Sequence, residues 1–526
     1  MRWLRTRHLR RTAQVLFFSA FVGLLILTTK PLSFPIPNDI FLRFSPLIGL
    51  QTMLAHRQVV YTLLAPGLLT IVVTLVLGRV FCGWFCPMGT TIDLFERLVL
   101  RGRRSKAPDQ ARLDRIRPAK YVLLVGMIAG ALLSFQPALF LDPISLVQRS
   151  FMASVHAPIY NTAQGARNVA LRPLRNRDIR IQAGKEPLVY RGGPLILVMF
   201  GTVLGLSALQ KRFWCRHLCP LGALLAIVSK LPVLRRSASS ACTGCMRCER
   251  DCKMGCIQSK GESYRSRECI LCYNCQAICP TSAVSFPFRF GAAEGMDRST
   301  QLSRRRLLGG LGAGVVWASA VRSSVAFSRT SGKSDLPDQA EENTKSSRRI
   351  RPPGALPERT FLQVCARCGE CMKVCPTNGL QPALTEAGLE GLFTPILVPR
   401  IGQCDEMCNA CCQVCPTGAI RNFEIADKKE KLILGKAVIS RSTCRPWYGD
   451  KDCEICDEHC SYDAIDTRVI EGRKRPVVLE DKCTGCGICE RWCPVTPDAA
   501  IYVVARDEKR PIVDEGLGFL SGFTSR

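Results

Sequence analysis

The chain has 526 residues, a formal net charge of +29 and 30 cysteines, and it is too long for one ordinary core. Its mean hydropathy of +0.10 averages an apolar part before residue 230 with a polar part after it. The Arg and Lys residues stand beside the apolar segments, as the positive-inside rule produces, so no nucleic acid is expected as a partner. The cysteines are packed into short motifs instead of being spread as in a disulfide framework, which indicates metal ligands.

Four apolar segments are each expected to cross a membrane, which takes about twenty apolar residues. Basic clusters at 1–11 and 97–120 favour the cytoplasm for the N-terminus and for the loop after the second segment, whereas the Arg residues of the long 142–191 loop count for less. The sequence therefore predicts a multi-pass α-helical domain over 1–230 in the bacterial inner membrane. The four segments are 13–29, 61–80, 121–141 and 192–209.

The apolar half repeats itself. GRVFCGWFCPMG closes the second segment and KRFWCRHLCPLG closes the fourth, so two CxxxCP motifs occupy equivalent places. Their spacing puts both sulfurs on one face of a helical turn just before a proline, and the repeat could bring all four thiols to one membrane surface. We interpret them as candidate redox thiols or a further metal site, with tightly packed helix ends as the alternative. The four are Cys82, Cys86, Cys215 and Cys219.

The strongest signal is the motif CxxCxxCxxxC, in which three thiolates hold one [4Fe–4S] cluster and the fourth ligates the neighbouring cluster. Two copies predict a cytoplasmic two-cluster ferredoxin domain over 231–300, with Cys256 left over. Exchange of the fourth cysteine gives one cluster the ligands Cys242, Cys245, Cys248 and Cys279. It gives the other cluster Cys269, Cys272, Cys275 and Cys252.

Four more motifs predict a four-cluster polyferredoxin domain over 361–526. Two are regular and two are stretched, and we expect nested pairing, outer with outer and inner with inner. In one stretched motif Cys412 is an alternative to Cys411. A zinc ribbon is the competing interpretation, but the third cysteine recurs at the same spacing in most motifs, so about six clusters are expected in the whole chain. The sixteen ligands are Cys365, Cys368, Cys371, Cys375, Cys404, Cys408, Cys411, Cys415, Cys444, Cys453, Cys456, Cys460, Cys483, Cys486, Cys489 and Cys493.

An arginine-rich apolar segment separates the two cysteine-rich domains. The run from Ser303 through Arg304 and Arg305 to Val321 looks like an internal twin-arginine export signal, with Ala318-Ser319-Ala320 as a candidate cleavage site. We assign 301–326 to this signal or anchor and 327–360 to a linker. An accidental arginine pair beside an ordinary anchor is the alternative.

Other cofactors have no visible site. The chain has no CxxCH motif for c-type haem, no GxGxxG unit and no P-loop. His56 and His156 fall at comparable places in the two repeats and are candidate proton acceptors for a quinol, because imidazole titrates near neutrality. Ordinary solvated histidines are the alternative.

Together these motifs resemble the NapH and NapG families. Residues 1–285 resemble NapH, the membrane component of a quinol dehydrogenase for periplasmic nitrate reduction, by four helices, CGWFCP, CRHLCP and a two-cluster tail. From Ser303 onward the chain resembles NapG, a four-cluster ferredoxin with a twin-arginine signal, although the insertion after Cys444 is longer than the family pattern. Related membrane proteins accompany methylamine dehydrogenase (MauN and MauM) and nitrous oxide reductase (NosR). A fusion of both halves departs from the usual two-gene arrangement.

The expected fold is an α-helical membrane domain of four spans plus a signal or anchor helix, followed by ferredoxin-like α+β [4Fe–4S] domains. The resemblance implies electron transfer from the quinol pool to a periplasmic redox protein or reductase, with the C-terminal domain in the periplasm. A maturation or maintenance factor for a periplasmic metalloenzyme is the second hypothesis, and a wholly cytoplasmic set of clusters is the third. About 30 Å of hydrocarbon would separate the two cluster groups. Either the quinone diffuses between the sides, the CxxxCP cysteines hold a cofactor, or the halves do not form one wire.

Overall fold

The computed structural model describes residues 2–28, 39–100, 113–136, 141–170, 187–229, 233–258, 263–288, 305–316, 319, 349–449 and 451–510. These residues divide into two compact units, which are treated separately. Unit 1 comprises the described residues of Met1–Leu27, Asn38–Phe151 and Leu195–Ser319, and unit 2 those of Thr28–Pro37, Met152–Pro194 and Ala320–Arg526. Ser303, Arg304 and most of the candidate cleavage site lie outside the described residues.

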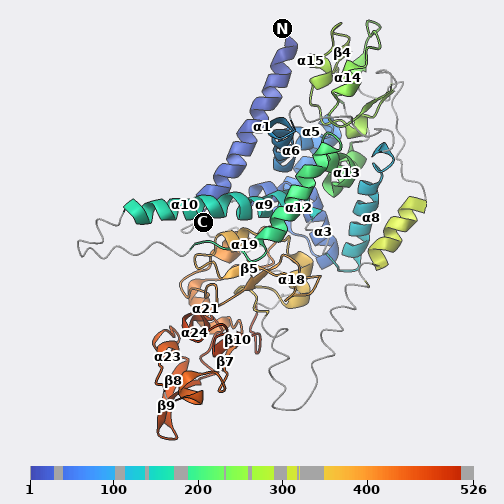
Figure 1. Cartoon of the computed structure of the whole chain (residues 1–526). Helices are drawn as coiled ribbons and strands as arrows, with labels where there is room; N and C mark the ends of the chain where they lie inside the picture. The colour runs from blue at the N-terminus through green and yellow to red at the C-terminus, as the bar shows by residue number, and fades with distance from the viewer. Residues whose placement is uncertain are drawn as a thin grey trace. The chain divides into compact units, whose positions relative to one another are not determined.

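Unit 1 is mainly helical (Figure 1). Several of its helices begin at a proline, whose fixed φ and missing N–H suit the first helical position. Helices α3, α4, α8 and α13 pack together, and α1 lies against α5 and α6. Its α-helices before the cysteine motifs are α1 (Arg2–Leu27), α2 (Ile40–Arg43), α3 (Pro46–His56), α4 (Tyr61–Leu77), α5 (Val80–Trp84), α6 (Pro87–Leu98), α8 (Ala119–Leu132), α9 (Pro143–Phe151), α12 (Gly193–Gly205) and α13 (Pro220–Val228).

An apolar helix is found at each of the four predicted spans. Within the described residues, Arg7–Leu27 is the one helix long and apolar enough to cross a membrane by length and composition, and the three others are shorter. The segment predicted as 121–141 ends its helix at Leu132, because Ser134 takes a left-handed φ of 58° that a continuing helix does not allow. The helical prediction is thus confirmed, whereas four complete spans do not follow from helix length.

A helix over 305–316, after the first arginine of the export motif, packs closely on α8 in unit 1. A Cβ added to Gly314 would stand 2.6 Å from the carbonyl oxygen of Gly126, and one added to Gly310 would stand 3.2 Å from the carbonyl oxygen of Val122. The two glycines are four residues apart and so lie on one face of the helix. Small residues at this spacing let two helix backbones approach, as they do in packed membrane helices.

The cysteine-rich part of unit 1 is built from very short elements. Strand β1 (Ser237–Ala238) pairs with β4 (Val284–Ser285), and β2 (Ile257–Gln258) pairs with β3 (Ser263–Tyr264), both antiparallel. Two one-turn helices, α14 (Arg247–Arg250) and α15 (Asn274–Ala277), each start just after the second cysteine of a motif.

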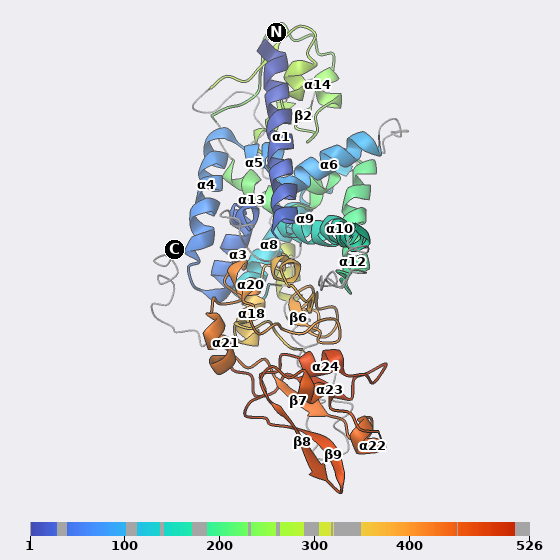
Figure 2. The same cartoon turned by 90° about the vertical axis from the view of Figure 1, so that its left-hand side faces the viewer.

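Unit 2 repeats this design on a larger scale (Figure 2). In the described part of this unit, every sheet has two antiparallel strands, and the cysteine sets occupy the core. It contains α10 (Ala157–Ala170), α18 (Glu358–Val364), α19 (Glu370–Lys373), β5 (Leu380–Pro382), β6 (Pro395–Leu397), α20 (Ala410–Gln413), α21 (Ile425–Lys431), β7 (Lys436–Ile439), α22 (Arg445–Tyr448), α23 (Ile455–Glu458), β8 (Ile465–Ile470), β9 (Arg473–Val478), α24 (Ile488–Trp492) and β10 (Ile501–Val504).

The segment before α12 belongs to unit 2, although it precedes the predicted polyferredoxin domain by more than a hundred residues. The Asn161 side chain exchanges two hydrogen bonds with the backbone of Leu188, at 3.1 and 2.8 Å. The amides of Asn378 and Gln381 both donate to the carbonyl oxygen of Val189 at 2.9 Å. These bonds fasten the 187–191 segment beside the first C-terminal cysteine motif.

One backbone feature separates the regular motifs from the stretched ones. In each regular motif the residue after the second cysteine is left-handed, which turns the chain into the one-turn helix that carries the third cysteine. The corresponding residues of the stretched motifs, Asn409 and Glu454, have negative φ. The left-handed residues are Met246, Tyr273, Gly369 and Gly487.

We expect Gly487→Ala to destabilise unit 2 more than Gly472→Ala. Both glycines are left-handed, with φ of 80° and 76°, so each alanine costs about 1 kcal/mol in backbone strain. Only at Gly487 would the new Cβ also meet a neighbour, 2.5 Å from Cβ of Pro399. Anaerobic denaturation followed by visible cluster absorbance measures the difference, and equal losses in the two variants would contradict this steric account.

Candidate iron–sulfur sites

The first two C-terminal motifs exchange their fourth cysteines. Cys415, the last of the second motif, lines one pocket together with Cys365, Cys368 and Cys371 of the first. Cys375, the last of the first motif, lies within electrostatic range of Cys404 and Cys411. Each set therefore has three thiols from one motif and one from the other, as paired [4Fe–4S] sites require.

The last two motifs do the same. Cys493 lines a pocket with Cys444, Cys453 and Cys456, and Cys460 lies within electrostatic range of Cys486 and Cys489. The predicted nested pairing is wrong, because the fold pairs consecutive motifs. Each consecutive pair shares one hydrophobic core, whereas the nested scheme grouped motifs by the regularity of their spacing.

The contacts of Cys411 and Cys412 differ and favour Cys411 as the ligand. Cys411 lies among Cys404, Cys408 and Cys375. The Cys412 thiol turns away and donates to the carbonyl oxygen of Asn409 at 2.9 Å and to Oδ1 of Asn422 at 3.0 Å. Burial raises the pKa of Cys412 to about 11, which keeps it a protonated donor.

Backbone N–H groups and buried lysines surround the sulfur atoms. The fourth cysteine of a motif accepts a backbone hydrogen bond in three cases, from Cys256 to Cys252 at 3.2 Å, from Ala464 to Cys460 at 3.3 Å and from Ile420 to Cys415 at 3.4 Å. Lys428 and Lys436 are buried, and each donates to the carbonyl oxygen of a ligand, Cys408 at 2.8 Å and Cys483 at 2.9 Å. Such bonds and charges stabilise an anionic iron–sulfur cluster, so the residues present fit that group.

In unit 1, Cys252 lies with Cys269, Cys272 and Cys275, which is the exchange predicted for the second cluster. In the first set, Cys248 lies beside Cys242 and accepts a hydrogen bond from Arg236 at 3.8 Å.

The leftover thiol of unit 1 has a place in this second set. Cys256 is 1% exposed, and its side chain hydrogen-bonds to the sulfurs of Cys252 and Cys269. That bond is the main reason that the pKa of Cys252 falls to about 5. Cys256 is therefore positioned as a donor to two ligand sulfurs and not as a ligand itself.

The two CxxxCP motifs come together in unit 1. Each of the six pairs among their four cysteines is close enough to interact electrostatically. Cys86 and Cys219 cap the N-termini of α6 and α13, and the backbone N–H of Gly222 donates to Cys219 Sγ at 3.2 Å. Burial raises the pKa of Cys215 to about 11. Within the described ranges, no group of three or more His, Cys, Asp or Glu is arranged around a single metal ion.

Two buried arginines complete this arrangement, and the sequence analysis missed them. Arg79 and Arg212 stand three residues before Cys82 and Cys215, and both are fully buried. Arg212 crosses to the other repeat, donating to the carbonyl oxygen of Cys82 at 3.3 Å and of Gly89 at 3.1 Å. The duplicated pattern RxxCxxxCPxG was the signal that could have identified both residues.

Each arginine has a carboxylate partner. Arg79 pairs with Glu268 at 2.7 Å, and Arg212 pairs with Asp93 at 2.8 Å. Glu268 also accepts from Lys120 at 2.5 Å, and these cations hold the pKa of its carboxyl well below the usual range. The thiol quartet thus lies beside permanent positive charge, but burial outweighs that charge and raises the pKa of Cys86, Cys215 and Cys219, so these thiols stay protonated near neutral pH.

The two candidate histidines are not equivalent. His56 ends α3 in unit 1, whereas His156 lies in unit 2 and is 3% exposed. Burial and the charge of Lys373 lower the pKa of His156 to about 4, so its ring is neutral at physiological pH. The alternative of a solvated loop histidine is therefore wrong for His156. Tyr190, a residue that the sequence did not single out, is buried within electrostatic range of Cys371 and Cys375.

We expect Cys411→Ser to remove one cluster, about four iron atoms, and Cys412→Ser to retain all of them. The adjacent cysteine is a matched control, because it is buried to a similar degree but hydrogen-bonds away from the set. Iron and sulfide quantification on anaerobically purified protein measures the difference. Loss of iron from the Cys412 variant alone would reverse the assignment.

Cys256→Ala is expected to lower the reduction potential of the second cluster of unit 1. A hydrogen bond to sulfur stabilises the reduced, more negative state, and alanine removes the donor. Cys256→Ser keeps a donor and should retain more of the potential. An EPR-monitored redox titration that finds the alanine variant unchanged would show that this thiol does not tune the cluster.

Comparison with known proteins gives a consistent result. A family model described as a 4Fe-4S binding domain matches residues 59–108 and 193–239, the two segments that carry the CxxxCP motifs. The chain is 40% identical over 171 residues to the methylamine utilization ferredoxin-type protein MauM of Methylorubrum extorquens, covering 30% of this chain and 73% of that protein. It is 36% identical over 179 residues to the ferredoxin-type protein NapG of Escherichia coli, covering 32% and 74%.

A third relative covers more of the chain. It is an uncharacterized protein of Methanocaldococcus jannaschii, 29% identical over 286 residues, or 54% of this chain and 96% of that protein. No solved structure matches.

Proposed function

The chain belongs to the family of ferredoxin-type iron–sulfur proteins that includes MauM and NapG, and on that basis we propose that it passes electrons from membrane quinol to a periplasmic redox partner. Electron transfer through [4Fe–4S] clusters is the general activity of this family of sites. The quinol donor, the periplasmic acceptor and the membrane topology are the specific parts of the proposal.

Two sets of contacts, one inside each unit, support the proposed topology. Residues expected in the cytoplasm meet one another in unit 1, where Glu268 of the two-cluster domain pairs with Arg79 and Lys120. Residues expected outside meet in unit 2, where Val189 accepts hydrogen bonds from the C-terminal domain. These two sets of contacts support a four-span arrangement with the N-terminus inside and the C-terminal domain outside.

Exposed apolar surface on the helices supports membrane insertion. On α4, the side chains of Leu69 and Val72 are 54% and 53% exposed, and on the 305–316 helix Val316 is 68% exposed. Apolar faces of this kind on several helices are unusual for a protein surrounded by water, and lipid would cover them. The close packing of Gly314 on α8 supports retention of that helix as an anchor.

A proton acceptor for the quinol is available in unit 2. Oxidation of a quinol releases two electrons and two protons, and the electrons pass one at a time into clusters. The neutral His156 ring can accept a proton, and neither of its nitrogens has a hydrogen-bond partner among the described residues. The neighbouring segment brings Tyr190 within electrostatic range of Cys371 and Cys375, so protons would leave close to the clusters that take the electrons.

We expect His156→Phe to slow the reduction of the C-terminal clusters by quinol about a hundredfold, the loss typical of a removed proton acceptor. His56→Phe is the control, because His56 lies in unit 1, and reduction by dithionite should be unaffected in both variants. Since the pKa of His156 is lowered to about 4, the wild-type rate should show no titration of this ring between pH 6 and 8. Stopped-flow absorbance and EPR on anaerobic full-length protein measure these rates.

Two outcomes would contradict different parts of the proposal. Equal rates in both variants would place the quinol site away from His156. Fully loaded wild-type clusters that neither ubiquinol nor menaquinol reduces would reject quinol as the donor. A maturation role would then be favoured if deleting the gene removed the cofactor from a periplasmic enzyme rather than its electron supply.

A further inference from the structure

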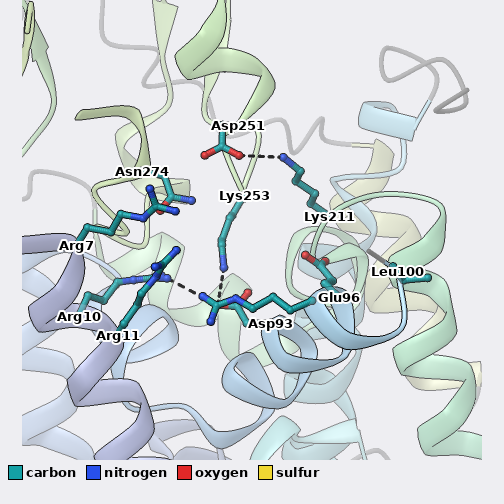
Figure 3. A pocket seen from close by; sticks show the side chains of 11 residues that line it. Arg7, Arg10, Arg11, Asp93, Glu96, Leu100, Lys211, Asp251, Lys253 and Asn274 are labelled. Carbon is teal, nitrogen blue, oxygen red and sulfur yellow. Dashed lines mark hydrogen bonds and ion pairs between the residues drawn. The ribbon is translucent and has the colours of Figure 1, made fainter. Parts of the chain in front are cut away.

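A strongly basic pocket of about 440 Å³ lies in unit 1, away from the CxxxCP quartet's own side chains (Figure 3). Its walls come from the start of α1, from the helix α6, from the turn that carries Lys211 and from the loops around the second cluster. Its lining residues are Arg7, Arg10, Arg11, Asp93, Glu96, Arg97, Leu100, Lys211, Asp251, Lys253 and Asn274. Six of these side chains are cationic and three are carboxylates.

The carboxylates of the pocket are already engaged. Asp93 pairs with Lys253 at 2.6 Å and, on its other side, with the buried Arg212 at 2.8 Å. Asp251 pairs with Lys211 at 3.2 Å, and Glu96 accepts from the backbone N–H of Arg212 at 2.6 Å. Positive charge therefore exceeds negative charge, and the excess is concentrated on the α1 wall.

That wall presents unused hydrogen-bond donors. Arg10 is 1% exposed, and its Nε and Nη1 have no hydrogen-bond partner among the described residues; its one ion pair, with Asp93, is 3.9 Å long. Nε atoms of Arg7 and Arg11 are likewise buried without a partner there. Figure 3 shows all three side chains reaching from α1 towards the pocket. Buried guanidinium donors without partners are costly, so an anion in this space would be stabilising.

Repulsion between like charges in the pocket also favours a bound anion. Arg7 and Arg11 are one helical turn apart, and the charges of Arg7 and Arg97 both repel that of Arg11. Guanidinium groups converging from a helix and its neighbour match the tetrahedral oxygens of a phosphate, which they bind in a bidentate manner.

We propose that this pocket binds a phosphate group, supplied by an anionic phospholipid headgroup or by soluble phosphate. Arg7, Arg10 and Arg11 line the pocket where the apolar stretch of α1 begins, which is the level of lipid phosphates in a helix that enters a membrane. The lipid source rests on the proposed membrane placement, whereas the phosphate site itself does not.

A phosphate bound in the pocket would change the reduction potential of the second cluster of unit 1. Lys253 follows the ligand Cys252 directly, Asn274 precedes the ligand Cys275, and Arg10 lies within electrostatic range of Cys272. A bound phosphate adds negative charge beside the cluster, which disfavours its reduced state. The reduction potential of this cluster should therefore fall when phosphate binds.

The test uses full-length protein with its clusters intact. One arm titrates inorganic phosphate into protein in neutral detergent at constant ionic strength. The other compares nanodiscs of phosphatidylcholine with nanodiscs containing phosphatidylglycerol, and both arms record binding and the potential of the unit 1 cluster. We expect Arg10→Gln and Arg11→Gln each to weaken binding about tenfold, as loss of a charge-assisted bond does. Arg115→Gln, which removes an exposed charge outside the pocket, should bind like wild type.

The outcomes are distinct. A response to phosphatidylglycerol alone identifies a lipid headgroup, and a response to inorganic phosphate alone identifies a soluble anion; either supports the pocket. Absence of binding in both arms, or equal binding by all three variants, would overturn it. Arg11 is only half-buried, so its variant remains informative if Arg10→Gln fails to fold. No quinol is present, so the result is independent of the proposed electron donor.

Discussion

The structure depends on one constraint: no cysteine motif can complete a cluster alone. Because the fourth thiol of each C-terminal motif lies in the set of its neighbour, consecutive motifs must fold together. This explains why unit 2 manages with two-stranded sheets and one-turn helices. The thiol sets occupy the places that large apolar side chains fill in ordinary small domains. Cluster ligation would therefore supply part of the folding free energy that a hydrophobic core usually supplies.

In unit 1 the cysteine sets are accompanied by buried ion pairs. Glu268, in the cysteine-rich part, pairs with Arg79 and Lys120 of the helical part. Asp93, in α6, pairs with Arg212 of the helical part and with Lys253 of the cysteine-rich part. Such ion pairs are weak evidence for stability, because desolvation offsets their attraction, but removing one partner leaves an uncompensated buried charge. They therefore fix where the two-cluster domain sits on the helix ends more than they strengthen the fold.

The spacing of residues along the sequence was sufficient to predict much of the fold and of the thiol sets. The CxxCxxCxxxC periods predicted the cysteine-rich domains and the place of Cys252 in the second set of unit 1, and hydropathy located all four apolar helices. The motif pairing predicted for unit 2 was wrong because pairing depends on which motifs lie close together in the fold. The regularity of the cysteine spacing within a motif does not determine that. Arg79 and Arg212 were missed, although their fixed distance from Cys82 and Cys215 was visible. The contact that distinguishes Cys412 from Cys411, a hydrogen bond to Asn422, lies beyond the motif itself.

The thiol quartet and the second cluster of unit 1 are neighbours through one short loop. The indole N–H of Trp84, which lies between Cys82 and Cys86, donates to the carbonyl oxygen of Leu271 at 3.2 Å, and Leu271 lies between the ligands Cys269 and Cys272. A change of charge on the quartet would therefore alter the electrostatic environment of that cluster. Unit 2 has a separate proton acceptor, His156, near its own thiol sets.

Each unit thus contains a cluster group with an adjacent candidate for coupled proton or thiol chemistry. If the proposed topology holds, the two groups would face opposite sides of the bilayer, and a diffusing quinone is the alternative that would connect them without a protein wire. The thickness of the hydrocarbon, about 30 Å, then sets no limit on electron transfer between them.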